Sequence, residues 1–278
     1  MLASNLVDFT RSRDRDRFLC SLLAPRHLQA PIWSTICFNW EISRIPDIAS
    51  QPILGQIRLA WWREALGEIF TNGQSQRHEV IEAMGEAIRG GFLPQRGLED
   101  LLDGWERELV EEPPVDTEAL ERRLAQTSGA LLDIWLTVLG ADKAGDRTAA
   151  RHVGIAWGLA ALLRALPGRY GNGRSDLPTN WLREAKLDPE AATPRASKGW
   201  PLIVERAVKL AREHLTVARQ QRPDTSRAAL PALALARLAD HHLNRIERRQ
   251  YDVFDKALAA PSPFLGLSLL PTRWSGRY

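Results

Sequence analysis

Carboxylate and arginine side chains in a few segments of this chain offer the chemistry most relevant to function. Four acidic residues lie in or beside apolar helical patterns: Glu41, Asp47, Asp133 and Asp176. Carboxylate oxygens are ligands that Mg²⁺ prefers, so these residues would form a metal site if the fold brought them together. The alternative is that they form ordinary ion pairs, as Glu41 would with Arg44 or Arg63.

Arginines are the second chemical group in these segments: Arg44, Arg58, Arg63, Arg164, Arg169 and Arg174. A guanidinium group can bind a diphosphate through parallel hydrogen bonds without a metal ion. We therefore consider Arg44, Arg58, Arg63 and Arg174 as candidate anion or diphosphate contacts. The alternative for each arginine is an ion pair with a nearby acidic residue, because charged side chains are seldom buried alone.

Other patterns that would indicate a metal site, a phosphate-binding loop or a disulfide framework are weak or missing from the sequence. The adjacent His241 and His242 would point apart on a helix, and no histidine four residues away completes a metal site. The Gly168–Gly173 segment lacks the Lys-Ser/Thr ending of a phosphate-binding loop. Two cysteines are too few for a disulfide framework, which favours a reducing compartment. We therefore expect no metal site.

The elements that would position these side chains are helices. Apolar residues recur at helical spacing almost everywhere, while the alternation typical of strands is scarce. Tryptophans 61 and 62 lie in one of the most strongly patterned segments. The spacing and the breakers predict helices over about 28–44, 53–70, 79–89, 95–109, 117–139, 144–166, 199–220 and 226–249. A Gly-rich loop is expected from Pro167 to Pro178, because proline interrupts a helix.

Composition limits the organisation and the partners. The 278 residues predict one all-α domain over 1–260, followed by a Pro-rich tail over 261–278 that is an extended strap or a frayed end. A net charge of +3 is too small to indicate nucleic acid. No segment reaches the ~18 uncharged apolar residues that span a bilayer. We therefore expect a cytoplasmic protein, soluble or peripheral to the inner membrane.

Four motifs together resemble the squalene/phytoene synthase family. The run Gln56–Leu66, with its adjacent tryptophans framed by arginines, is preceded by Phe38–Ile45 and followed by Gly154–Arg164 and Tyr251–Asp255. The resemblance extends from about Asp14 to Leu258 in the same order. It implies the isoprenoid synthase fold, a helical bundle around a central cavity. In that fold Trp61 and Trp62 would form a cavity wall, although tryptophans are more often plain core.

The resemblance also implies where magnesium would bind in an active synthase. Members ionise an allylic diphosphate with the help of magnesium ions held between two aspartate motifs. The first motif falls on Ser43 and Asp47, with Glu41 beside it. The second falls on a set of positions without carboxylates: Ala161, Arg164, Ala165 and Arg169. Arg169 reverses the charge of a metal ligand, which should repel magnesium.

This pattern of loss is similar to the branch of the family that assists assembly of respiratory complex I. The string Gly158–Pro167 and the later Leu177-Pro178 carry that similarity. It implies an accessory factor without cofactor, which binds a respiratory complex subunit or another assembly factor and contacts the membrane peripherally. Two alternatives stay open: an active Mg-dependent prenyl-diphosphate synthase, and a non-catalytic isoprenoid or lipid binder.

Overall fold

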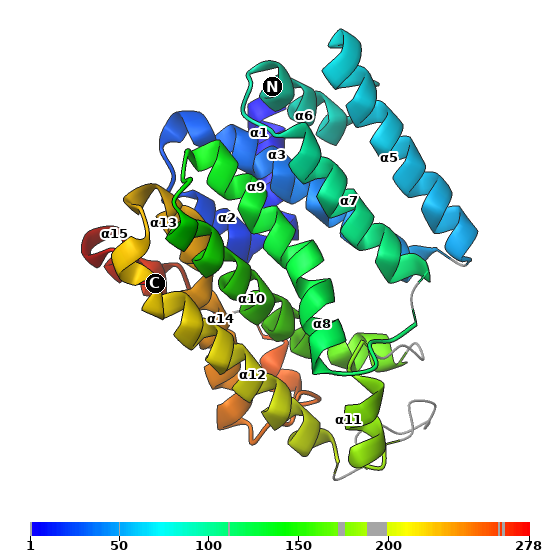
Figure 1. Ribbon diagram of the computed structural model, residues 1–278, viewed down its shortest axis with the longest axis vertical. Helices are drawn as coiled ribbons and strands as arrows, with labels where there is room; N and C mark the ends of the chain where they lie inside the picture. The colour runs from blue at the N-terminus through cyan, green and yellow to red at the C-terminus, as the bar shows by residue number, and fades with distance from the viewer. Residues whose placement is uncertain are drawn as a thin grey trace.

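The computed structural model describes residues 2–49, 51–110, 112–171, 176–187, 199–260, 262 and 265–278, and these residues form helices and no β-strand (Figure 1). The prediction of an all-α fold is confirmed. The α-helices are α1 (Leu2–Arg13), α2 (Arg15–Ser21), α3 (Arg26–Ser43), α4 (Ile45–Ile48), α5 (Pro52–Asn72), α6 (Glu79–Arg89), α7 (Gln95–Val110), α8 (Thr117–Leu124), α9 (Ala130–Leu139), α10 (Ala144–Gly171), α11 (Thr179–Glu184), α12 (Trp200–Gln220), α13 (Leu230–Leu233), α14 (Leu235–Arg248) and α15 (Leu270–Ser275). Among them, none is long and apolar enough to cross a membrane.

Helix α10 runs through the middle of the molecule, with α9 on one side and α12 and α14 on the other (Figure 1). Its buried residues are largely small or aliphatic, among them Ala149, Val153, Ala156 and Leu159. Small side chains let neighbouring helices approach on several faces at once. The whole bundle is therefore organised around this helix, which also carries the second motif.

Helices α8 and α9 form one rod that is interrupted by a π-helical turn, η1 (Ala125–Gly129). Glycines bring this turn against α10: a Cβ atom at Gly154 would lie 2.5 Å from the Cα of Gly129 and 2.8 Å from its nitrogen. One turn later, Gly158 leaves room for the side chains of Leu124 and Ser128. The backbones of the two helices are thus in direct contact, which sets the position of the α10 face beyond Gly158.

The N-terminal half of the chain packs α3 against α1 and α6, and α5 against α6 and α7. Trp62 is buried there, with its ring centroid 5.4 Å from that of Phe38. Both cysteines of the chain are buried free thiols in this half. Burial raises the pKa of Cys37 to about 12, while the hydrogen bond with Thr10 acts in the opposite direction. These thiols are therefore held in their protonated, unreactive form.

Two expectations about element ends were wrong. Helix α10 does not stop before Pro167 but continues to Gly171. Arg169 in its last turn makes ion pairs with two other segments, which supports the helix beyond the proline. The helix predicted over 226–249 is divided near Ala234, where Pro231 lies at the start of the short α13.

The C-terminal tail is neither extended nor frayed over residues 265–278. It forms a 3₁₀ segment, η6 (Leu265–Leu269), and then α15. Tyr278 is buried, and its hydroxyl donates a hydrogen bond of 2.9 Å to the backbone oxygen of Ala218. The backbone oxygen of Tyr278 accepts hydrogen bonds from Arg219 in the last turn of α12 and from Arg222 just after that helix. The tail is therefore part of the packed structure.

The contact between α10 and η1 predicts a position-specific cost. Gly154→Ala should lower the free energy of unfolding by ~1–3 kcal/mol, because the new methyl group meets backbone atoms that cannot move aside. Urea unfolding measures this change. The matched control is Gly168→Ala in the same helix, where no atom lies within 4 Å of the new methyl group. It should leave stability unchanged or raise it by up to about 1 kcal/mol, and equal losses in both variants would contradict the prediction.

Candidate functional site

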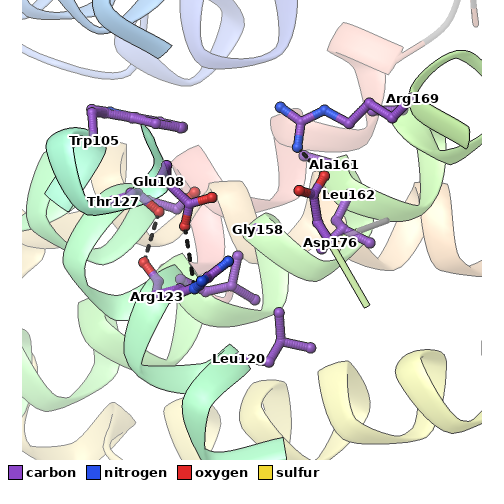
Figure 2. A pocket seen from close by; sticks show the side chains of 13 residues that line it. Trp105, Glu108, Leu120, Arg123, Thr127, Gly158, Ala161, Leu162, Arg169 and Asp176 are labelled. Carbon is purple, nitrogen blue, oxygen red and sulfur yellow. Dashed lines mark hydrogen bonds and ion pairs between the residues drawn. The ribbon is translucent and has the colours of Figure 1, made fainter. Parts of the chain in front are cut away.

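Three of the four second-motif positions line a cavity of about 170 Å³ between α7, α8, η1 and α10 (Figure 2). Ala161, Ala165 and Arg169 are spaced four residues apart, so they share one face of α10. Leu120, Leu124 and Leu162 contribute apolar surface, and Trp105 of α7 lies at one side. The structure therefore brings the three predicted positions together on one cavity wall.

Arg169 connects three segments at this wall. Its guanidinium donates hydrogen bonds to Asp176, which follows α10 in the chain, and to Asp47 of α4 at 3.2 Å. Burial acts to lower the pKa of Arg169, but the Asp176 and Asp47 carboxylates outweigh it and raise the pKa above its usual value. A permanent positive charge is thus held between the surviving first-motif carboxylate and a carboxylate beyond the second motif.

A second pair of charges lies on the opposite side of the cavity. Figure 2 shows Glu108 and Arg123 facing one another. They form an ion pair with a nitrogen-to-oxygen distance of 3.8 Å. Arg123 also donates to the backbone oxygen of Glu112. Both side chains are largely buried. The cavity therefore has an apolar wall between two cation–carboxylate pairs.

The four carboxylates do not form one site. Asp47 and Asp176 meet at Arg169, whereas Asp133 of α9 pairs with Arg147 of α10 at 2.5 Å. Glu41 lines a separate hollow between α3, α4 and α5. Within the described part of the chain, no group of three or more His, Cys, Asp and Glu residues is arranged to hold a metal ion. The hypothesis that all four carboxylates converge is therefore wrong.

The remaining first-motif position makes only a local contact. The hydroxyl of Ser43 donates a hydrogen bond of 3.2 Å to the backbone oxygen of Trp40 in its own helix. This contact is typical of serine in a helix, where the hydroxyl finds a carbonyl one turn earlier. Ser43 therefore presents no charged ligand where the resemblance places one.

The candidate anion contacts separate into two groups. Arg63 pairs with Asp103 and Glu106 of α7, each at 2.9 Å, as the ion-pair alternative predicts. Arg44 stacks on the Trp40 ring at 4.4 Å, and with Arg58 it lines the hollow that contains Glu41. Arg174 lies outside the described residues. Arg44 and Arg58 thus border this hollow, and among the described residues neither makes an ion pair with a carboxylate.

Arg164 lies in a different environment from the other second-motif positions. It pairs with Asp16 of α2 at 3.1 Å, and Asp16 also accepts a hydrogen bond of 2.8 Å from Nε2 of His242 in α14. Burial would raise the pKa of Asp16, but His242 and Arg164 reverse this and the pKa is lowered. Burial lowers the pKa of His242. An ionised Asp16 therefore joins a neutral His242 to Arg164 and links α2, α10 and α14.

The two tryptophans differ in exposure. Trp62 is buried among core side chains, while Trp61 is half-buried and its ring lies 5.0 Å from that of Trp62. Both line the α3–α4–α5 hollow, and neither lines the cavity on α10. The prediction that they line the central cavity of the fold therefore stays a prediction.

Several cavity residues were not singled out by the sequence. Trp105, Glu108 and Arg123 come from two amphipathic helices whose surface patterns are ordinary. The pairing of Arg123 with Glu108 could not be predicted from their spacing in the sequence, because it depends on how α7 and α8 pack. Asp16 is similar: only the tertiary fold reveals that this carboxylate is buried.

Solved structures identify the fold class of this chain. The chain superposes on a dehydrosqualene synthase in complex with a ligand, with a TM-score of 0.79, 17% identity, and coverage of 98% of this chain and 95% of that one. It also matches the squalene synthase HpnC of Alicyclobacillus acidocaldarius, with a TM-score of 0.74, 19% identity, and coverage of 89% and 94%. These likenesses show an all-α isoprenoid synthase fold.

The family follows from the sequence itself. The family model described as squalene/phytoene synthase matches residues 10–264, and the chain belongs to the squalene/phytoene synthase family. Two similar curated relatives are the mouse and human proteins named NADH dehydrogenase (ubiquinone) complex I, assembly factor 6. They are 28% and 25% identical over 273 residues, which cover 98% of this chain and 82% of each relative.

The Arg169 ion pairs predict a measurable contribution to stability. Arg169→Leu should lower the free energy of unfolding by roughly 1–3 kcal/mol, because two partly buried carboxylates lose their cation. The control is Arg147→Leu, which breaks a pair whose side chains are 51% and 49% exposed and should cost less than about 1 kcal/mol. Chemical denaturation of both variants tests the difference, and an equal cost would show that the Arg169 pairs are ordinary surface pairs.

The neutral state of His242 predicts a pH dependence. The unfolded histidine takes up a proton near pH 6.5 but the native one does so only at lower pH, so stability falls as pH drops below about 6.5. His242→Gln removes this titration and should make the decline shallower. Burial also lowers the pKa of His152 and His241, so part of the decline should remain. Unfolding measured from pH 7.5 to 5 checks this, and an unchanged slope would contradict it.

Proposed function

We propose that this protein is a non-catalytic member of the squalene/phytoene synthase family that acts as an accessory factor in the assembly of respiratory NADH dehydrogenase. The observation that carries the proposal is Arg169, whose guanidinium is bound to both Asp47 and Asp176. In this arrangement a side chain supplies the positive charge between the carboxylates. The protein needs no metal ion to neutralise them.

The donor set at the second motif does not fit a magnesium cluster. Ala161 and Ala165 have no side-chain oxygen, and Arg169 has only donors. Mg²⁺ requires near-octahedral oxygen coordination, and only Asp47 and Asp176 would supply carboxylates. Both already accept hydrogen bonds from Arg169. We therefore expect no cofactor, and we assign no step of prenyl transfer to these residues.

The size of the cavity supports the same conclusion. Pockets for drug-sized ligands are typically about 300–1,000 Å³, and the cavity beside Ala161 and Ala165 is about 170 Å³. A diphosphate with a long prenyl chain would need the surrounding helices to move apart. An active synthase or a large isoprenoid binder that used this cavity would require such a movement.

The assembly role is supported by the relatives. The mammalian proteins that match 98% of this chain are named as complex I assembly factors. An accessory factor of that kind needs a protein partner, and we propose a subunit of the respiratory complex or another assembly factor. The folded scaffold then serves as a binding surface, and the residues that replaced the metal ligands maintain its shape.

A cellular experiment tests the assembly role. Cells that lack this gene should contain less assembled NADH dehydrogenase on native gels, and their membranes should oxidise NADH more slowly. The wild-type gene should restore both. Asp47→Asn should restore them as well, because Asp47 is 40% exposed and a binding role does not require a metal ligand there. Normal enzyme levels in the deletion strain would overturn the assembly role.

An in vitro assay tests the loss of catalysis separately. Purified protein is mixed with farnesyl or geranylgeranyl diphosphate, with and without Mg²⁺, and pyrophosphate release is measured. We expect no release above that of a blank without protein. Mg-dependent release that Asp47→Asn abolishes would show that the protein is an active synthase. Binding of either diphosphate without release would favour the isoprenoid binder.

A further inference from the structure

Aliphatic side chains are exposed together at the junction of α4 and α5. Ile48 of α4 and Ile53, Leu54 and Ile57 of α5 are among the few large apolar side chains that solvent reaches. Ile57 is 60% exposed. We call these four residues the α4–α5 apolar face. Helix α5 lies along one edge of the molecule, beyond α7, so this face is open to the outside (Figure 1).

Two arginines border this face. Arg44 and Arg58 line the adjoining hollow of about 470 Å³, together with Ile48, Ile57 and Trp61. Within the described residues, neither guanidinium has a carboxylate within 4 Å. Arg44 is held in place by stacking on Trp40. Both positive charges are therefore available to an anion that approaches the apolar face.

The segments around the face contain few negative charges. No aspartate or glutamate lies between Asp47 and Glu64, although Arg58 and Arg63 are in the same stretch. Asp47 is already paired with Arg169. Glu41 is the only carboxylate that lines the hollow among the described residues. The surface from α4 through the first turns of α5 is thus apolar and basic.

We propose that the α4–α5 apolar face docks on a bilayer surface that contains anionic phospholipids. Ile48, Ile53, Leu54 and Ile57 would enter the boundary between headgroups and acyl chains, and Arg44 and Arg58 would bind lipid phosphates. Trp61, half-buried beside Arg58, has the amphipathic ring that is typical of membrane interfaces. This inference is independent of the proposed function, because it rests on exposed residues of α4 and α5 and not on the cavity beside α10.

Charge and shape favour a bilayer over a protein partner. Ile53, Leu54 and Ile57 span a sector of about 100° on the α5 surface, a broad apolar sector of the kind found on interfacial helices. Guanidinium groups beside such a sector match the negative potential of anionic lipids. Long arginine side chains also place their charge in the headgroup layer while their stems stay apolar.

Vesicle co-sedimentation of the full chain tests the proposal. Wild-type protein should bind vesicles of phosphatidylcholine and phosphatidylglycerol about tenfold or more tightly than vesicles of phosphatidylcholine alone. Ile57→Glu should weaken binding to the anionic vesicles by roughly tenfold, since it places a carboxylate in the apolar face. The double variant Arg44→Gln/Arg58→Gln should lose most of the preference for anionic lipid.

Leu202→Glu is the matched control for Ile57→Glu. Leu202 of α12 is also a large apolar residue at the surface, 64% exposed, and it lies on a different helix. Because both substitutions add one charge at an exposed site, both variants should fold, which circular dichroism can verify. Leu202→Glu should bind vesicles as the wild type does. Equal weakening by both variants would show a general charge effect and would overturn the proposal.

A position-specific readout locates the contact. Ile57→Cys, labelled with an environment-sensitive fluorophore, should show a blue shift on anionic vesicles, while labelled Leu202→Cys should not. The native cysteines are buried, so the dye reports on the introduced site. Absence of wild-type binding to anionic vesicles would overturn the proposal. A blue shift only at position 202 would overturn it as well.

Discussion

The structure depends on the close contact between α10 and the π-helical turn of the α8–α9 rod. Gly129 and Gly154 allow the two backbones to touch, and no larger residue fits between them. This contact fixes the rotation of α10, because a rotated helix would present side chains where only glycine is accommodated. The face that carries Ala161, Ala165 and Arg169 therefore points into the cavity.

Under the proposed function, Arg169 stands where an active synthase would hold a metal ion, and this would change what the cavity can do. A magnesium ion can bind a substrate phosphate while it remains attached to carboxylates, because it has several coordination positions. The guanidinium of Arg169 is planar and its donors are directed at Asp47 and Asp176. Arg169 can thus neutralise the two carboxylates as a metal ion would. It offers no open coordination position that could bind the phosphate of a leaving group. The proposed non-catalytic role therefore requires only that Arg169 keep these segments together.

Much of the fold could be predicted from the sequence, whereas the site required the structure. The spacing of apolar residues predicted helices such as 79–89 and 95–109 within a residue of their ends. Arg169 was predicted at the second motif, but its pairing with Asp47 and Asp176 was not, since 122 residues separate Arg169 and Asp47. Local signals also failed at Pro167, where tertiary ion pairs support a helix that proline would otherwise end. Ion pairs between residues far apart in the chain produce no periodic pattern, so the sequence alone does not predict them.

The two buried thiols make the α2–α3 region a natural reporter of local opening. Cys20 and Cys37 are the only cysteines of the chain, and both are inaccessible to solvent. A thiol reagent can react with them only when the surrounding helices separate transiently, so the rate of labelling measures the free energy of that opening. The two thiols thus allow transient opening of the N-terminal half to be measured without introducing a cysteine.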